Sequence, residues 1–250
     1  MEFSPFNLSE KTILVTGASS GIGRAISIAC SKMGATVVLT GRNKERLDET
    51  LTQMSQGNHL VLSADLTIDE ERERLVSQLP KLDGLVQCAG VGSRIPCKMI
   101  STADIDHIFD PNFKAPVLLQ TSLLSQKKLN KAASIVFIAS RAASSPSMGN
   151  AVYSASKGAI LSYAKCLALE LASRQIRVNC ICPAMIWTDL ILRDGLSQEE
   201  MEDAQMKYPL KRFGKPEDVA NLAIYLLSDA SSWMTGSAID LSGGGEGTLV

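Results

Sequence analysis

Histidine, aromatic residues and long apolar runs are scarce in this chain, and each scarcity excludes a class of structure or site. Two of the 250 residues are histidines, and aromatic side chains make up 5%. Lys and Arg (25) nearly balance Asp and Glu (26), and the chain has no basic block of the kind that binds nucleic acid. No run reaches the ~18 consecutive apolar residues of a membrane span, and residues 1–11 lack the apolar core of a signal peptide. We therefore expect a cytoplasmic protein with neither nucleic acid nor membrane as partner.

The six cysteines form no spacing that is typical of a metal site. Cys180 and Cys182 are separated by one residue, so they do not make C-x-x-C, and His59 and His107 are the two available imidazoles. We therefore expect no metal. Small buried thiols, favoured over disulfides, are expected where cysteines fall in apolar runs. These are Cys30, Cys88, Cys166, Cys180 and Cys182.

Apolar runs alternate with amphipathic stretches along the whole chain, which is the pattern of a parallel sheet covered by helices. With 45% hydrophobic and 20% charged residues, the chain is long enough for one large α/β domain over residues 1–250. Right-handed crossovers then predict a doubly wound fold of about seven parallel strands, with ligands beyond their carboxyl ends. Strands are expected near 11–16, 35–40, 58–64, 83–88, 133–139, 176–182 and 237–241. Helices are expected near 22–33, 43–55, 68–79, 102–127, 151–173 and 216–228.

The stretch from Ala184 to about Leu210 differs from the rest. It contains Trp187 and a helix start at Ser197–Glu200 with the pattern of a capping box. Long connections in compact domains are usually lids or binding loops. We therefore expect residues 184–210 to form a lid over the ligand site.

A glycine-rich turn follows the first predicted strand. The segment 17–23 (GASSGIG) lies between the strand at 11–16 and an amphipathic stretch that begins at Ile22. Strand, glycine turn and helix in this order are the context that a nucleotide-binding loop requires. The missing side chains let the backbone approach a pyrophosphate, and the helix N-terminus offers it free N–H groups.

Tyr153 and Lys157 lie four residues apart, so on a helix their side chains share one face. A neighbouring ammonium favours the phenolate, which is what general acid–base catalysis by a tyrosine near neutral pH requires. Taken alone, this spacing also arises by chance in many helices. Ser140 lies thirteen residues upstream, at the end of the apolar run 134–139. It is the combination with the glycine-rich turn that makes these three residues a candidate catalytic set.

Together these segments resemble the short-chain dehydrogenase/reductase family in its single-domain form, which implies a Rossmann-type fold. The glycine spacing is G-x-x-x-G-x-G, and it occurs with Ser140, Tyr153 and Lys157. The likeness extends from about Lys11 to Gly245. Further matching segments are Asp65, Gln87–Gly90, Asn112, Val178–Asn179, Pro183, Thr188, Leu210–Asp218, Thr235–Gly236 and Gly243–Gly244.

The resemblance implies roles for four catalytic residues. Tyr153 would protonate the carbonyl oxygen during reduction and act as base in the reverse direction. Lys157 would stabilise the phenolate and hold the nicotinamide ribose hydroxyls, and Ser140 would position the substrate oxygen. Asn112 would anchor a proton-relay water beside the lysine. It lies in the run DPNFKAP (110–116), whose two prolines indicate a kink or break in the predicted helix.

Cofactor choice depends on the end of the second strand. Family members that prefer NAD carry an acid there, which accepts from the ribose 2′-hydroxyl. In this chain Gly41 stands at that position and Arg42 follows, and a guanidinium can bind a 2′-phosphate through two charge-assisted hydrogen bonds. We therefore expect NADPH, with Asn43 and Lys44 as further donors. The alternative is that Arg42 is an ordinary solvated arginine at the start of a loop.

The resemblance also implies the remaining contacts with the cofactor. Asp65 would lie at the adenine end, although the same residue could begin a helix. The full set of implied cofactor-binding residues is Gly17, Ser19, Ser20, Gly21, Ile22, Gly23, Arg42, Asp65, Leu66, Ala89, Gly90, Tyr153, Lys157, Pro183, Ile186 and Thr188.

The activity that these residues imply is NADP-dependent hydride transfer between nicotinamide and a carbonyl or secondary alcohol. Within the family, the C-terminal half is most similar to 3-oxoacyl-carrier-protein reductases, so 3-oxoacyl thioesters are one substrate class. Sugar, polyol and steroid alcohols are the others. A non-catalytic binding or regulatory subunit is an alternative, but such proteins usually lack the tyrosine or the lysine. Nucleotide-sugar epimerases and dehydratases are longer and have a different glycine spacing.

Two kinds of partner follow from the resemblance. An acidic acyl carrier protein would need basic residues near the site entrance, and the candidates are Lys127, Lys128, Lys131 and Arg174, which could equally be ordinary solvated charges. The predicted helix 151–173 has few charges and is apolar nearly all round, so it should be buried on more than one side. We therefore expect a homotetramer, or at least a dimer, in which Leu161, Tyr163 and Ala164 face a partner.

Overall fold

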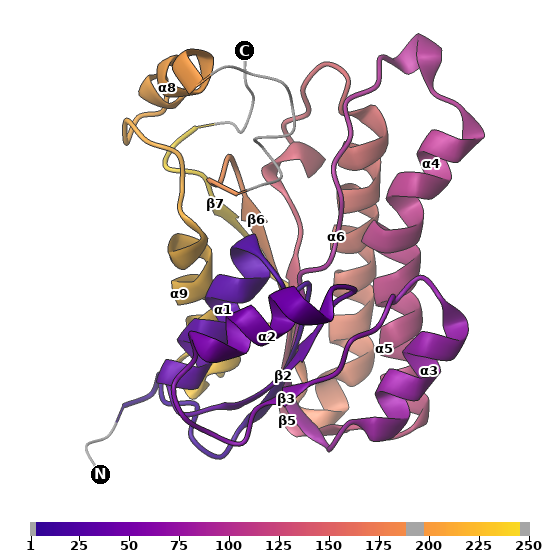
Figure 1. Cartoon of the computed structure of the whole chain (residues 1–250), viewed down its shortest axis with the longest axis vertical. Helices are drawn as coiled ribbons and strands as arrows, with labels where there is room; N and C mark the ends of the chain where they lie inside the picture. Colours follow the sequence, from indigo (N-terminus) through magenta and orange to yellow (C-terminus); the bar gives the residue numbers. More distant parts are fainter. Residues whose placement is uncertain (1–3, 189–197, 246–250) are drawn as a thin grey trace.

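Seven parallel strands form the centre of the molecule (Figure 1). The computed structural model describes residues 4–188 and 198–245. The strand order is β3-β2-β1-β4-β5-β6-β7, and every neighbouring pair is parallel. This confirms the expected single doubly wound domain. The strands are β1 (Thr12–Thr16), β2 (Thr36–Thr40), β3 (Leu60–Val61), β4 (Leu82–Gln87), β5 (Leu129–Ile138), β6 (Arg177–Pro183) and β7 (Ala238–Leu241).

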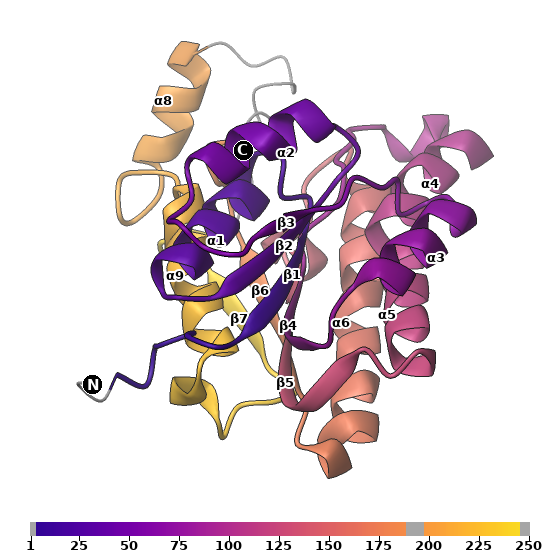
Figure 2. The ribbon, with the colours of Figure 1, turned by 60° about the horizontal axis from the view of Figure 1, so that its bottom comes forward.

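Helices cover both faces of the sheet (Figures 1 and 2). One layer contains α1 (Gly21–Lys32), α2 (Lys44–Thr52) and α9 (Pro216–Leu227). The other contains α3 (Asp69–Gln78), α4 (Thr102–Phe109), α5 (Ala115–Ser125) and α6 (Ala151–Leu171). Helix α8 (Gln198–Met206) lies apart from both layers, at the top of Figure 1. Short 3₁₀ turns occur at Cys97–Met99, Arg141–Ala143, Ala172–Arg174 and Asp229–Ser231.

Strand β1 shows why the middle of a central strand is continuously apolar. Its residues alternate between the two cores: Ile13 and Val15 pack with α1 and α9, whereas Leu14 packs with the opposite layer. All three side chains are fully buried. A strand that is covered on both faces has no position at which a polar side chain could reach water, which explains the continuous apolar run.

The strand order places a topological switch point between β1 and β4, because β2 lies on one side of β1 and β4 on the other. Ligands of doubly wound sheets bind beyond the carboxyl ends of the strands at such a point. The glycine-rich turn follows β1, and Ala89 and Gly90 follow β4. The fold therefore brings these two segments to one place.

The expected helix at 102–127 contains a π-helical segment. Helix α4 passes into a π-helix at Asp110–Lys114 and then into α5. Pro116 has no N–H to donate to the carbonyl four residues before it, and within the π-helix the N–H of Ala115 donates to the carbonyl of Asp110, five residues back. The prolines therefore widen one turn, and the helix continues through them.

Three further expectations about length and burial need correction. The strand expected at 58–64 is reduced to two residues at the sheet edge, where β3 pairs with β2 alone. Cys166, expected to be buried, is exposed, because it lies on the side of α6 that faces away from the sheet. The apolar run around it gave no sign of this, since α6 carries apolar residues on both sides. Ala164, expected to face a partner, is buried within the chain.

Of the other five thiols, one is exposed and four have a raised pKa. Cys97, on the 3₁₀ turn after β4, is exposed. Burial raises the pKa of Cys30, Cys88 and Cys180 to about 12, and that of Cys182 to about 11. These four thiols therefore stay protonated and unreactive near neutral pH.

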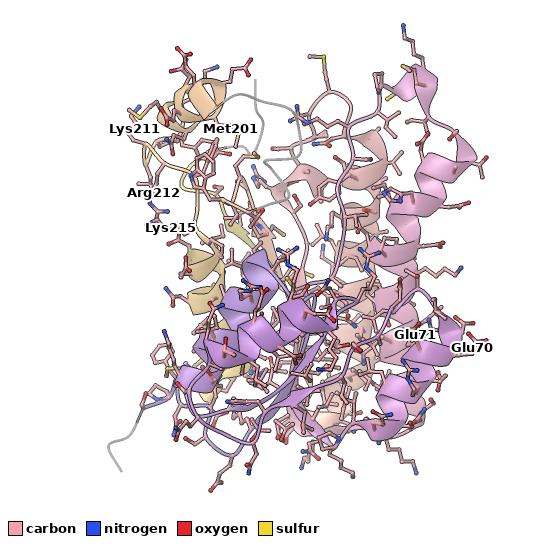
Figure 3. The ribbon with its side chains drawn as sticks, in the orientation of Figure 1. Glu70, Glu71, Met201, Lys211, Arg212 and Lys215 are labelled. Atoms are coloured by element: carbon pink, nitrogen blue, oxygen red, sulfur yellow. The ribbon has the colours of Figure 1, made fainter. Side chains whose placement is uncertain are left out.

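A small third core anchors the segment around α8. Met201, Tyr208 and Phe213 are buried together, apart from the two main cores. The last described residues pack on the same segment: the N–H of Leu210 donates to the carbonyl of Gly243, and a Cβ on Gly245 would lie 2.5 Å from the Tyr208 ring. Lys211, Arg212 and Lys215 follow between α8 and α9 (Figure 3).

Part of the expected lid, residues 189–197, lies outside the described residues, and with it the start of the expected capping box at Ser197. Across the described chain, no helix combines the length and the apolar character that crossing a bilayer demands.

Candidate active site

The glycine-rich turn requires glycine where two backbone segments touch. Gly17 has a φ of +66°, and a Cβ there would lie 3.0 Å from the backbone of Ala89. A Cβ on Gly23 would lie 2.2 Å from the carbonyl oxygen of Gly17, closer than any real contact. The hydroxyl of Thr16 accepts hydrogen bonds from the N–H groups of Cys88 (2.9 Å) and Ala89 (3.0 Å). The loop therefore lies directly on the end of β4.

The start of α1 is open to an anion. Its N-cap, Ser20, makes no side-chain capping bond, and no acidic residue occurs in the first turn. Free N–H groups and the positive end of the helix dipole suit a phosphate, and a carboxylate in this turn would have opposed one. Ser19, Gly21 and Ile22 lie in the same turn. The residues present therefore fit the pyrophosphate of a dinucleotide.

Arg24, on α1, holds this loop through hydrogen bonds, although nothing in the sequence pattern indicates that role. Its Nη2 donates to the carbonyl of Ser19 (2.7 Å) and lies 3.1 Å from Oε2 of Glu49 on α2. Its Nε donates to the hydroxyl of Thr50 (3.0 Å), and that hydroxyl donates to the carbonyl of Ala18 (2.9 Å). Helix α2 thus holds two carbonyls of the loop. Glu49 and Thr50 lie on a different element from Arg24, so sequence spacing gave no signal for the pairing.

Lys157 and Tyr153 share one face of α6, as their spacing predicts. The lysine is 6% exposed, and its Nζ lies 5.8 Å from the centroid of the Tyr153 ring. The same Nζ donates a 2.9 Å hydrogen bond to the carbonyl of Ile138, the last residue of β5. Ser140 follows two residues later and accepts from the N–H of Ala142 (3.1 Å). The end of β5 thus connects the serine to the lysine and the tyrosine.

Asn112 lies in the π-helix, 1% exposed, and uses both ends of its amide. Its Oδ1 accepts from the N–H of Val91 (2.8 Å), and its Nδ2 donates to the carbonyl of Val91 (2.9 Å) and to the hydroxyl of Ser156 (3.2 Å). A Cβ on Gly90 would lie 2.9 Å from Asn112 Oδ1 and 3.5 Å from Lys157 Nζ. Asn112, Gly90 and Lys157 therefore meet at one point.

The end of β2 lies against the glycine-rich turn. A Cβ on Gly41 would be 3.6 Å from Oγ of Ser19, an ordinary contact, so a larger side chain fits there. Arg42 is exposed, and no hydrogen bond or ion pair ties it to another described residue. The further donors expected nearby are engaged within α2. Asn43 Oδ1 accepts from the N–H of Arg46, and Lys44 pairs with Asp48 at 2.6 Å.

Asp65 and Leu66 follow β3 and precede α3. Oδ1 of Asp65 accepts from both the N–H (3.0 Å) and the hydroxyl (2.7 Å) of Thr67. This local turn leads the chain toward α3, whose N-cap is Ile68, so Asp65 does not itself cap the helix. The carboxylate keeps its second oxygen for another partner.

The carboxyl end of β6 brings a third segment to the site. Pro183 ends the strand and is buried. Ile186 is 5% exposed and forms an isolated parallel bridge with Gly214. Thr188 is the last described residue before the gap, and its Cγ2 lies 3.2 Å from where a Cβ on Gly21 would be. Thr188 therefore lies against the glycine-rich turn.

Comparisons with known proteins identify the family. A family model described as enoyl-(acyl carrier protein) reductase matches residues 17–246. The 3-oxoacyl-[acyl-carrier-protein] reductase FabG of Rickettsia felis is 37% identical over 238 residues, which cover 95% of this chain and 98% of the relative. The human dehydrogenase/reductase SDR family member 4 is 35% identical, covering 95% and 88%.

Solved structures give the same result. A 7α-hydroxysteroid dehydrogenase complexed with NADH and 7-oxo glycochenodeoxycholic acid superposes with a TM-score of 0.89 at 30% identity over all of both chains. A protein described as an NAD(P)-dependent gluconate 5-dehydrogenase from Beutenbergia cavernae, with NADP bound, gives 0.87 at 31% identity, covering 96% and 98%.

The chain belongs to the short-chain dehydrogenase/reductase family. It is an oxidoreductase that acts on CH–OH or carbonyl groups with a nicotinamide cofactor. The alternatives of a non-catalytic subunit and of a nucleotide-sugar epimerase are therefore set aside. No group of three or more potential metal-ligating side chains occurs within residues 4–188 and 198–245.

The contact between Gly23 and Gly17 makes a direct prediction. Gly23→Ala should cost about 1–3 kcal/mol of stability through overpacking, a fall in Tm of roughly 2–12 °C for a domain of this size. It should also weaken nicotinamide-cofactor binding, because the displaced loop holds the pyrophosphate. Thermal unfolding and fluorescence titration with NADPH measure the two effects.

Gly158, in α6, supplies the matched control, because a Cβ there meets nothing within 4 Å in the chain. Gly158→Ala should leave cofactor binding unchanged and stabilise the helix by about 0.5–1 kcal/mol. Equal effects of the two substitutions would show that the loop geometry does not depend on glycine at position 23.

Proposed function

We propose that this chain is an NADPH-dependent carbonyl reductase and that its substrates are 3-oxoacyl thioesters. The observation that carries the proposal is the arrangement of α6. A nearly buried ammonium lies beside the Tyr153 ring, one hydrogen bond from the strand end that leads to Ser140. The reacting carbonyl would lie against Tyr153 and Ser140.

Each residue has a separate task in this mechanism. The reduced nicotinamide, when bound, supplies the hydride. Tyr153 gives its phenolic proton to the substrate oxygen, and Lys157 stabilises the phenolate that remains. The N–H of Ala142 already donates to Ser140 Oγ, so the hydroxyl hydrogen is free to donate to the substrate oxygen and position it.

Asn112 contributes by holding the backbone at the end of β4. Its amide bonds both the N–H and the carbonyl of Val91, next to Gly90 and the lysine. We infer that these bonds fix the backbone at Gly90 and Val91, against which the nicotinamide ribose and the relay water would lie. The residue thus acts through position and carries no proton itself.

Support for the substrate class comes from the relatives. The 37% identical FabG is named for 3-oxoacyl thioester reduction on acyl carrier protein, and it is covered almost end to end. The two structural neighbours are named for a steroid and a sugar acid. Sugar, polyol and steroid alcohols are therefore the second class, and a panel of 3-oxoacyl thioesters, keto sugars and steroid ketones distinguishes them.

Tyr153→Phe tests the proton-transfer role, because it removes the hydroxyl and keeps the ring. We expect NADPH to bind as before while turnover of the best panel substrate falls by at least about a hundredfold. Lys157→Ala should lower both turnover and NADPH affinity, since the lysine has two tasks. Fluorescence titration and the rate of NADPH oxidation measure these effects.

Tyr163 lies on the same helix with its ring packed on Phe113 and Phe137, so Tyr163→Phe is the matched control. It should retain turnover. Substantial activity in Tyr153→Phe, at the level of this control, would contradict the proposed proton donor.

The preference for NADPH rests on charge at the end of β2. Gly41 places no carboxylate beside Ser19, and the exposed guanidinium of Arg42 follows with no partner among the described residues. A charge-assisted hydrogen bond contributes about 1.5–3 kcal/mol, and each ~1.4 kcal/mol is tenfold in affinity. We therefore expect NADPH to exceed NADH by at least about tenfold in kcat/KM.

The double variant Gly41→Asp, Arg42→Ala should reverse this preference. An aspartate side chain fits at position 41, because its Cβ would make only ordinary contacts. The change should appear mainly in KM for the cofactor, since the 2′-phosphate is remote from the reacting carbon. Lys44→Ala is the control, because Lys44 is paired with Asp48. An unmodified enzyme that used both cofactors equally would refute the role of Arg42.

A carrier-protein partner would have to reach the site from another chain. Lys127 and Lys128 end the α5 segment just before β5, and Arg174 follows α6, so this cluster lies at the amino end of β5. Ser140 lies beyond the carboxyl end of the same strand. Lys128 and Arg174 also donate to backbone carbonyls. The cluster therefore does not lie at the site entrance within one chain.

We propose a homotetramer in which α5 and α6 face a partner. A surface groove of about 480 Å³ lies between them, lined by Val117, Leu124, Tyr163 and Cys166 among others. Leu169, further along α6, is 80% exposed. An apolar face of this kind is typical of an interface. Any acyl carrier protein bound at the basic cluster would then serve a neighbouring protomer.

Thiol labelling at micromolar protein concentration tests this interface together with sedimentation. We expect a tetramer in which iodoacetamide modifies Cys97 quickly and Cys166 slowly, although both are exposed in the single chain. Cys166→Glu should dissociate the assembly, whereas Cys97→Glu should not. A sedimenting monomer whose two thiols react equally fast would reject the interface.

A further inference from the structure

The start of α3 carries two charged side chains that bond back to the loop before it. Oε2 of Glu71 accepts from the N–H of Asp65 (2.8 Å), and Nη1 of Arg72 donates to the carbonyl of Leu66 (3.0 Å). Glu71 projects from this helix in Figure 3. Two consecutive residues of α3 therefore hold two consecutive residues of the loop.

Arg72 is an unusual residue for this task, because it is 4% exposed. Its Nη2 pairs with Asp69 at 2.7 Å, and its Nε is buried without a hydrogen-bond partner among the described residues. Burying a guanidinium in an apolar layer is costly unless its hydrogen bonds replace the lost water. The buried residues next along the helix are Leu75 and Val76, so an aliphatic side chain would have packed here without that cost. What the guanidinium adds, and an aliphatic side chain could not, is the hydrogen bond to the Leu66 carbonyl.

The braced loop presents one donor and one acceptor side by side. Oδ1 of Asp65 is occupied by Thr67, while its other oxygen has no partner among the described residues. The N–H of Leu66 likewise has no described partner. An acceptor next to a donor is complementary to the N6 amino group and the N1 nitrogen of adenine. To recognise this edge of adenine, the backbone must hold both Asp65 and Leu66 in place.

We propose that Arg72, assisted by Glu71, is a positioning residue that sets the loop at Asp65–Leu66 for the adenine ring of the cofactor. Arg72 touches neither cofactor nor substrate and acts through the Leu66 carbonyl. Glu71 acts through the Asp65 N–H. This inference rests on the proposed function, since it assigns the loop to the adenine end of NADPH.

The experiment compares NADPH with nicotinamide hypoxanthine dinucleotide phosphate, in which a carbonyl oxygen replaces the adenine amino group. The unmodified enzyme should bind NADPH more tightly than this analogue, because in hypoxanthine the Asp65 acceptor would face a carbonyl oxygen and the Leu66 N–H would face the N1–H. In Arg72→Met, which keeps the apolar stem, the ratio of the two Kd values should fall by about tenfold, toward one. The Kd for NADPH should rise accordingly.

The controls separate positioning from general stability. Glu70→Ala, at the neighbouring exposed position of the same helix, should change neither Kd. Glu71→Gln retains an acceptor for the Asp65 N–H and should behave like the unmodified enzyme. Glu71→Ala should lose discrimination and speed hydrogen exchange of that amide. Arg72→Lys should be intermediate, and it keeps the test available if the methionine variant does not fold.

The outcomes are distinct. A lowered Tm with an unchanged Kd ratio in Arg72→Met, Arg72→Lys and Glu71→Ala would overturn the inference and leave only a structural role. An unmodified enzyme that binds NADPH but does not distinguish the analogue would also overturn it. An unmodified enzyme that binds neither NADPH nor NADH would instead refute the proposed function.

Discussion

The ammonium of a lysine that is only 6% exposed needs hydrogen-bond acceptors, and for Lys157 the carbonyl of Ile138 is one of them. That bond fixes α6 against the end of β5. The tyrosine one turn before the lysine and the serine two residues after Ile138 are positioned by the same contact. Gly90, which follows β4, and Asn112, in the π-helix, lie next to the ammonium. The geometry of the candidate site therefore depends on how one buried charge is accommodated.

Much of the fold follows from local signals. Strand β1 and the turn after it could be predicted because the middle of a strand buried on both faces is apolar, and because glycine is needed at both positions: Gly17 has a positive φ, and a Cβ on Gly23 would collide with backbone. The pairing of Tyr153 with Lys157 needed only the period of a helix. These features are encoded within a few residues, where sequence spacing determines geometry.

The parts that could not be predicted depend on residues far apart in the chain. Arg24 finds Glu49 and Thr50 only once α1 and α2 lie side by side. Two prolines indicated a break near Asn112, but whether the helix stops or widens depends on whether each carbonyl finds another donor. In the structure it widens, and the asparagine amide reaches both polar groups of Val91. The exposure of Cys166 likewise depends on which side of α6 the sheet covers, which an all-apolar helix does not reveal.

The contact between the last described residues and the segment after α8 has a practical consequence. Gly244 and Gly245 lie so close to Pro209 and Tyr208 that a Cβ on either would be within 3 Å of those rings. The segment after β7 therefore packs directly on the residues that support α8. An affinity tag or fusion partner joined soon after Gly245 would pull on that support, whereas the chain at Pro5 contacts Ala230, in the 3₁₀ turn after α9. For expression and labelling, a tag or fusion partner is therefore better attached at the amino end.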